Sequence, residues 1–234
     1  MPVFFRHASL RRGFSLIEML AVLSLLLFLG AILFPAFSVA RQNGQRLSCA
    51  SNLRQLGLAF KQYREDFDGG MPITAYVVGA DYSFPNGNHP THTSQRRALW
   101  MHEIYRYIKS TQIYNCPNGD GIYSGGYFWT GGEPSYGFNF YLSGKFDIKY
   151  PAKTALMADC NYYSMSPDPK QIVGAINPDN NNPPVPRHLE TLNMAFVDGH
   201  VKPVKLDDWR SDFTRSETAS ATDPVWAKYD PRLQ

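Results

Sequence analysis

The chain has 234 residues, of which 44% are hydrophobic and 18% charged, and its formal net charge is +3. This length suits one or two domains. Arg6, Arg11 and Arg12 precede residue 14 without any acid, and the rest of the chain has equal numbers of basic and acidic residues. The pattern excludes a basic nucleic-acid-binding domain, and we expect no nucleic acid among the partners.

The first predicted element is a membrane-spanning helix over residues 14–37, where Glu18 is the only charged side chain. About 20 apolar residues suffice to span a membrane, and arginines before them favour a cytoplasmic N-terminus. A carboxylate costs roughly 2.5–3.5 kcal/mol at the centre of such a helix. Glu18 therefore either reaches the interface or meets a cationic partner. Pro35 is the expected position of a kink.

An amphipathic stem helix is predicted over residues 38–67. Its apolar residues recur at alternating intervals of four and three, which is typical of one buried helix face: Cys49, Leu53, Leu56, Phe60, Tyr63 and Phe67. The Asp68-Gly69-Gly70 run that follows predicts the end of the helix. We expect a globular head over residues 68–206 and a polar tail over residues 207–234.

Within the head, the sequence predicts short strands at residues 73–78 and 153–159 and a helix at residues 96–109. A hairpin is expected over residues 191–206, because Asp198-Gly199 between two apolar runs indicates a two-residue turn. Pro203 cannot donate a backbone hydrogen bond, so the second strand of this hairpin should lie at a sheet edge.

Three cysteines are present, and none is in a CxxC pair of the kind that common zinc sites use. Cys49 lies on the buried stripe of the stem and Cys116 lies in the head. A disulfide between them would tie the stem to the head, and two buried thiols are the alternative.

The head also holds a candidate polar or divalent-cation cluster: Asp159, His188, Asp198 and His200. The alternative is that Asp198 forms the turn and His188 bonds a buried group. No catalytic motif is evident, so we expect neither an enzyme nor a cofactor, this possible cation aside.

The N-terminal sequence from Arg11 to Glu18 resembles the cleavage and methylation signal of type IV prepilins and pseudopilins. This resemblance implies a leader of residues 1–13, cleavage after Gly13 and methylation of the new N-terminal residue, Phe14. Glu18 is then the fifth mature residue. Its carboxylate can meet the cationic amine of a neighbouring subunit and set the axial register between them.

Four further motifs are similar to those of one subgroup of prepilin-like proteins: Cys49-Ala50-Ser51-Asn52-Leu53, Cys116-Pro117, Ser135 to Asn139, and His188 separated by nine residues from Asp198-Gly199. The fold that this resemblance implies is α+β, with a long N-terminal helix packed on a small antiparallel sheet.

The function implied is that of a structural subunit of a type IV pilus or a type II secretion pseudopilus. Its partners would be prepilin peptidase, other copies or pilins, and the inner membrane, crossed once with the N-terminus cytoplasmic and the head outside. One alternative is a membrane-tethered binding module that carries the signal but does not polymerise. Another is a secreted protein cut after Ser38-Val39-Ala40.

Overall fold

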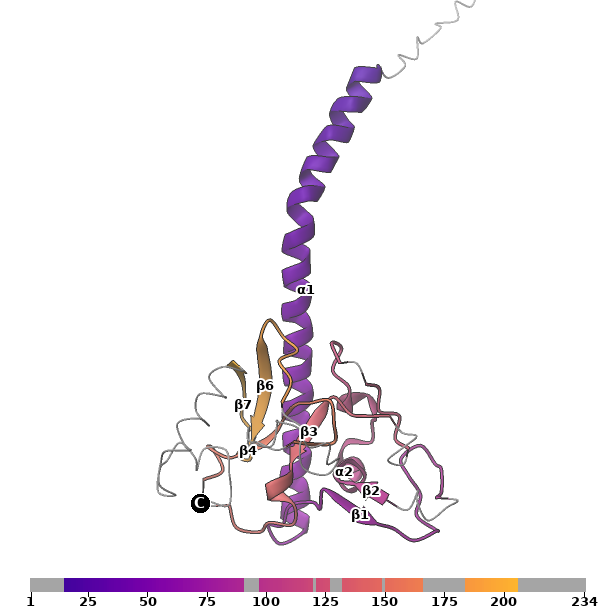
Figure 1. Cartoon of the computed structure of the whole chain (residues 1–234), viewed down its shortest axis with the longest axis vertical. Helices are drawn as coiled ribbons and strands as arrows, with labels where there is room; N and C mark the ends of the chain where they lie inside the picture. Colours follow the sequence, from indigo (N-terminus) through magenta and orange to yellow (C-terminus); the bar gives the residue numbers. More distant parts are fainter. Residues whose placement is uncertain are drawn as a thin grey trace, which may run out of the picture. The chain divides into compact units, whose positions relative to one another are not determined.

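The computed structural model describes residues 15–90, 97–119, 121–126, 132–148, 150–165 and 184–205. The α-helices of the described residues are α1 (Leu16–Asp66) and α2 (Trp100–Ile108), and the short 3-10 helices are η2 (Gln112–Tyr114) and η3 (Phe140–Leu142). The strands are β1 (Ala75–Val77), β2 (Arg97–Leu99), β3 (Tyr136–Asn139), β4 (Ala155–Asp159), β5 (Ser164–Met165), β6 (Thr191–Phe196) and β7 (Val201–Lys205). A long N-terminal helix with a small, mainly antiparallel sheet confirms the predicted α+β class, with a pilin-like layout (Figure 1).

The chain divides into two compact units, which meet between Arg41 and Gln42. In the first unit α1 is helical from Leu16 and continues through Pro35 without a break. Pro35 has no N–H for the carbonyl one turn earlier, so one helical hydrogen bond is missing there. Every large apolar side chain from Leu16 to Val39 is exposed. Among the described residues, α1 is the one helix long and apolar enough to cross a membrane.

In the second unit, the C-terminal part of α1 packs against the strands and α2 of the head (Figure 1). The predicted stripe is buried from Cys49 to Tyr63. Phe67 departs from this pattern, because α1 ends at Asp66 and Phe67 is 39% exposed. Its ring stacks on Tyr63 with centroids 4.3 Å apart. The apolar face of α1 from Cys49 to Tyr63 therefore packs against the head, as the spacing of its apolar residues predicts.

The main sheet has the strand order β5-β3-β4-β6-β7. All of its pairings are antiparallel except that of β3 with β5. All five residues of β4 are buried, as expected for a central strand. Strand β7 lies at the sheet edge, which confirms what Pro203 indicated.

The hairpin between β6 and β7 differs from the predicted two-residue turn. The Phe196 N–H donates to the His200 carbonyl, and the Gly199 N–H donates to the Phe196 carbonyl. The loop therefore has three residues, Val197 to Gly199. Gly199 has a φ of 96°, the left-handed conformation that closes a three-residue loop and that glycine adopts without strain.

The predicted helix at residues 96–109 was wrong in its first turn. Residues Arg97–Leu99 instead form β2, which pairs antiparallel with β1. The helix then starts at Trp100, whose N–H donates to the Thr74 carbonyl at 3.1 Å. These residues are extended because they pair with β1, a strand distant in the sequence. The local periodicity of the sequence does not indicate such a pairing.

The core is centred on aromatic rings from α1, α2 and β3. Phe60 lies between Trp100 and Phe138, with ring centroids 5.4 and 5.1 Å apart. The Trp100 indole N–H donates to the Tyr163 carbonyl at 2.6 Å, so its polar atom is satisfied although the residue is fully buried. Trp100 is therefore a core packing residue of the head.

His102 is a buried, titratable member of this region. Its Nδ1 accepts a hydrogen bond from the Leu99 N–H at 2.9 Å, and its ring packs edge-on against Phe84. Burial lowers the pKa of His102 to about 4. The neutral imidazole is therefore the form that the fold accommodates, because a charged ring would lose its hydration.

We expect the contribution of His102 to the stability of the head to be lost as the pH is lowered from about 6.5 to about 4, because the unfolded chain protonates His102 first. A shift of this size corresponds to a loss of up to about 3 kcal/mol, complete near the folded-state pKa. Burial raises the pKa of Glu133 to about 7, so this residue has the opposite pH dependence. The measurement is thus the difference in urea-unfolding free energy between wild type and His102→Asn, which keeps an acceptor for Leu99. A difference that does not change between pH 7 and pH 4 contradicts the assignment.

Candidate functional site

Glu18 closes the N-terminus of α1. Its Oε2 accepts a hydrogen bond from the Ser15 N–H at 2.8 Å, and the Ser15 hydroxyl accepts one from the Ile17 N–H at 3.3 Å. This reciprocal arrangement is a variant of the capping box, in which the Ser15 hydroxyl accepts from the second rather than the third helical N–H and two backbone N–H groups are satisfied. The sequence analysis missed it, although Ser15-x-x-Glu18 is its signature. The predicted processing residues Gly13 and Phe14 lie outside the described residues.

The capping role does not use up the Glu18 carboxylate. The side chain is exposed, and an ionised carboxylate has about four acceptor sites, of which the Ser15 N–H takes one. The position at the helix N-terminus also suits a negative charge. Glu18 can therefore cap its own helix and still accept an ammonium group from another chain.

A second cluster surrounds the Cys49–Cys116 disulfide, which closes a sequence separation of 67 residues. Both cysteines are buried, so the predicted link between stem and head lies inside the core. The third cysteine, Cys160, keeps its thiol and is also buried. Burial raises the pKa of Cys160 to about 12, which keeps the unreactive thiol form at neutral pH.

His188 and Asp159 lie beside this disulfide. The His188 Nε2 is 3.4 Å from the Cys116 sulfur and 3.6 Å from Asp159 Oδ2. The same carboxylate oxygen accepts the backbone N–H of Asn193 at 2.7 Å. Asp159 Oδ1 and His188 Nδ1 are both buried and have no hydrogen-bond partner in the described part of the chain. The cluster thus contains more polar atoms than the surrounding residues satisfy.

Burial sets the charge state of this pair. It raises the pKa of Asp159, an effect that the Asn193 N–H and the Arg187 charge partly offset. Burial also lowers the pKa of His188, and the charges of Arg187 and Arg46 lower it further. Near neutral pH the imidazole is therefore uncharged, and the short His188–Asp159 separation is not an ion pair.

The predicted four-residue polar cluster separates into two pairs. Asp198 and His200 contact each other at the hairpin turn, where the Asp198 carboxylate is 2.6 Å from the His200 Nδ1. Asp159 is bonded to Asn193, near the start of β6, whereas Asp198 lies beyond its end. Asn193 and Asp198 are five positions apart, four residues of which are in β6, so the two pairs lie on the order of 15 Å apart. Asp198 belongs to the turn, as the simpler alternative held, and His200 follows it.

The motifs noted in the sequence converge on the disulfide cluster. The Asn52 amide donates to the Asn115 carbonyl and to the Tyr136 hydroxyl, at 3.1 and 3.3 Å. Cys49, three residues earlier, is bonded to Cys116, and Cys116 contacts His188. Residues from α1, β3 and the segment before β6 therefore meet around one disulfide.

Arg187 is a positioning residue that the sequence analysis did not single out. Its guanidinium donates to the Ser135 carbonyl at 2.6 Å, to the Cys160 carbonyl at 2.9 Å and to the Asn161 side chain. A planar fork of five donors suits this set of acceptors. Arg187 thereby fixes the backbone from which the next residue, His188, enters the cluster.

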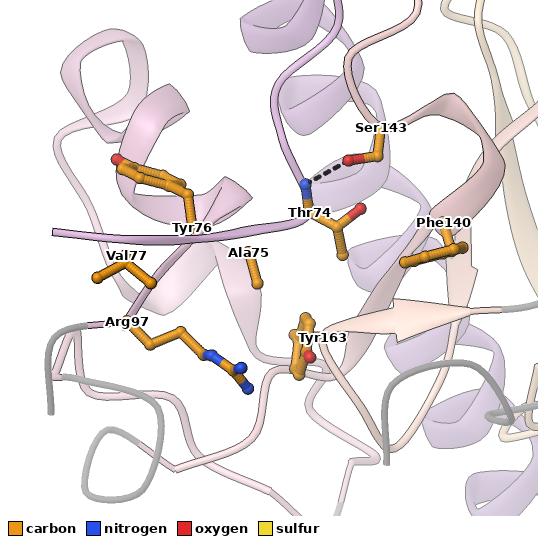
Figure 2. Close-up of a pocket in the computed structure, with 8 residues that line it drawn as sticks. All are labelled: Thr74, Ala75, Tyr76, Val77, Arg97, Phe140, Ser143 and Tyr163. Atoms are coloured by element: carbon orange, nitrogen blue, oxygen red, sulfur yellow. Dashed lines mark hydrogen bonds between the residues drawn. The ribbon is translucent and has the colours of Figure 1, made fainter. Parts of the chain in front are cut away.

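A pocket of about 310 Å³ lies next to β1 in the head (Figure 2). Its lining residues are Thr74, Ala75, Tyr76, Val77, Arg97, Phe140, Ser143 and Tyr163. Figure 2 shows Tyr76 on one side of β1 and Ala75 and Val77 on the other, as strand alternation requires. Among the described residues that line it, one side chain, Arg97, is cationic and none is a carboxylate or an imidazole.

The described structure defines an α+β protein whose first helical turns are apolar and exposed and whose second unit is a small head. Residues 9–34 match the family model described as the prokaryotic N-terminal methylation motif. The chain therefore carries a prepilin-like N-terminal signal, which covers the predicted cleavage site, Glu18 and most of the apolar helix. Searches among curated proteins and among solved structures gave no match.

Proposed function

We propose that this protein is a structural subunit of the pilin or pseudopilin type, rather than an enzyme. In this proposal prepilin peptidase cuts after Gly13 and methylates Phe14, and the apolar part of α1 then anchors the chain in the inner membrane with the head outside. Assembly with other copies, in a type IV pilus or a secretion pseudopilus, follows. The supporting observation is the methylation motif at residues 9–34, followed directly by an exposed apolar helix.

The physical argument concerns what covers that helix. Exposed apolar residues in contiguous patches are rare on soluble proteins and mark membrane or protein contacts. Lipid and the apolar helices of neighbouring subunits are both suitable covers. Glu18 distinguishes the two, because a carboxylate at that depth costs free energy unless it has a partner. A cleaved neighbour supplies one in its α-amine.

The experiment compares Glu18→Ala, Glu18→Gln and Glu65→Ala in cells that express the full chain with its assembly machinery. Glutamine keeps an acceptor for the Ser15 N–H but removes the charge, and Glu65 is an exposed acid farther along α1. We expect the amount of assembled material to fall at least about tenfold in both Glu18 variants. A tenfold change in the assembly equilibrium corresponds to about 1.4 kcal/mol. Glu65→Ala should assemble normally. The measurement is the fraction of chain in sheared or cross-linked filaments.

The tethered binding module is the second candidate, and the pocket beside β1 is the observation that favours it. It makes the opposite prediction for the same variants. If Glu18→Gln leaves the distribution of the chain unchanged while Glu18→Ala merely loosens the first helical turn, the charge has no assembly role. The pocket would then become the feature to explain.

A further inference from the structure

We propose that the reduced form of this protein binds one Zn²⁺ ion at the disulfide cluster, through Cys49, Cys116, His188 and Asp159. The oxidised form, which has the Cys49–Cys116 disulfide, would not bind it there. The site would then have two exclusive states, a covalent link and a metal link, between the same stem and head positions. This inference does not depend on filament assembly.

The first argument is the geometry of the donor atoms. One ligand atom from each of Cys49, Cys116 and His188 lies within 4.8 Å of the other two. Zinc bonds of about 2.0–2.3 Å place the ligand atoms of a tetrahedron about 3.3–3.8 Å apart. The His188 Nε2 is 3.4 Å from the Cys116 sulfur and 3.6 Å from Asp159 Oδ2. Both separations from His188 lie within this range. Asp159 is outside the group of three and reaches the site through its contact with His188, and the two sulfurs, which are bonded to each other in the disulfide, must move apart on reduction to take tetrahedral positions.

The second argument is chemical. Two thiolates, an imidazole and a carboxylate are all ligand types that zinc accepts, and structural zinc sites are closed and four-coordinate. Cys49, Cys116, His188 and Asp159 are all buried. Asp159 Oδ1 has no hydrogen-bond partner among the described residues, so this carboxylate keeps an acceptor atom for a metal, and His188 would bind through Nε2, the nitrogen that faces Cys116.

The third argument is charge. Zinc with two thiolates and one carboxylate has a net charge of −1, which is costly in a buried site unless a cation is near. Arg187 supplies that cation, since its charge acts on both Asp159 and His188. Its hydrogen bonds to the Ser135 and Cys160 carbonyls hold it in place beside the cluster.

An external dithiol gives two electrons and two protons to the Cys49–Cys116 disulfide and is itself oxidised to a disulfide. The chain then has two thiols, and Zn²⁺ displaces a proton from each as the thiolates bind. In the reverse direction an external disulfide takes two electrons from the two thiolates and leaves as a dithiol after taking up two protons, and the Cys49–Cys116 bond re-forms. The metal is then released, because a disulfide sulfur lacks the thiolate charge that makes cysteine a zinc ligand.

The test uses the full chain in detergent micelles with Cys160→Ala, so that Cys49 and Cys116 are its only cysteines. Oxidised and anaerobically reduced samples are titrated with Zn²⁺, and the bound metal is measured by elemental analysis after dialysis. Co²⁺ serves as a spectroscopic probe of ligand type and geometry. We expect one ion per reduced chain, tetrahedral cobalt bands with thiolate charge transfer, and no stoichiometric binding to the oxidised chain.

Matched variants separate a built site from adventitious thiol binding. His188→Ala should raise the dissociation constant of the reduced chain at least about tenfold, and Asp159→Asn should weaken binding in the same direction. His200→Ala removes an imidazole outside the cluster and should change nothing. Any of three results would overturn the proposal. They are equal zinc affinities of His188→Ala and His200→Ala, no binding of zinc to the reduced chain, and binding to the oxidised chain that is as strong as binding to the reduced chain.

Near-UV circular dichroism tests the proposal if reduction of the disulfide disrupts the aromatic packing of the head. A reduced head that regains its aromatic signal when one equivalent of Zn²⁺ is added supports the proposal, since metal binding then supplies folding free energy. A reduced chain that binds metal without regaining that signal contradicts it.

Discussion

Replacing both Cys49 and Cys116 with serine is expected to lower the unfolding free energy of the head by about 4 kcal/mol. The disulfide closes a sequence separation of 67 residues. In the chain-entropy model, a cross-link over a loop of this size removes about 4 kcal/mol of conformational freedom from the unfolded chain. The loss is a large part of the roughly 5–15 kcal/mol that a typical domain has.

Urea unfolding of the full chain in micelles, followed by near-UV circular dichroism with a chelator present, measures this effect. Cys160→Ser is the matched control, because it replaces a buried thiol without opening the disulfide. We expect the double variant to lose clearly more stability than the control. Adding a reductant should not lower the stability of the double variant further, because it has no disulfide to reduce. A loss below about 1 kcal/mol would mean that the disulfide is not a main link between stem and head.

Phe60→Ala is expected to cost about 3–5 kcal/mol, the usual range for deleting a buried aromatic ring. Phe60 is 1% exposed and contacts the rings of Trp100 on α2 and Phe138 on β3. Its removal leaves a cavity where three elements meet and also removes two aromatic contacts. The stem should then separate from the head at a lower urea concentration.

Leu58→Ala is the control for Phe60→Ala, since Leu58 lies on the same helix and is 59% exposed. It removes apolar side-chain atoms without opening a cavity, and we expect a change within about 0.5 kcal/mol. If the two variants are equally stable, α1 does not seat on the head through this stripe, and the pilin-like packing of stem on head is wrong.

The parts of the fold that follow from local periodicity could be read from the sequence. The intervals of three and four from Cys49 to Tyr63 place these residues on one helical face, and the structure buries that face. Strand β4 and the edge position of β7 followed from an apolar run and from Pro203. Each of these inferences needed only neighbouring residues.

The parts that depend on distant pairing could not be read in this way. Residues 97–99 have a helix-like pattern, yet they pair with β1 because a partner strand 20 to 24 positions earlier is available. Asp159 and His188 come together, whereas Asp198 does not join them, because the register of β4 against β6 places the turn at the far end of the strand. Spacing along the chain does not report a register.

In the candidate site, too, some features follow from neighbouring residues and others depend on the folded structure. The offset of Glu18 from Gly13 identified the methylation motif, which covers residues 9–34. The capping box at Ser15 was also present in the sequence and was overlooked beside the stronger signal. The grouping of Cys116, His188 and Asp159 required the folded head, because these residues come from three separate segments.

The most direct test of the account is the intact mass of the mature protein, purified from the membranes of cells that make it, with mapping of its N-terminal peptide. The account predicts a chain that begins at Phe14 and has one additional methyl group on its α-amine. A mature chain that begins at Arg41 would contradict it, because the apolar helix and Glu18 would then be absent from the finished protein.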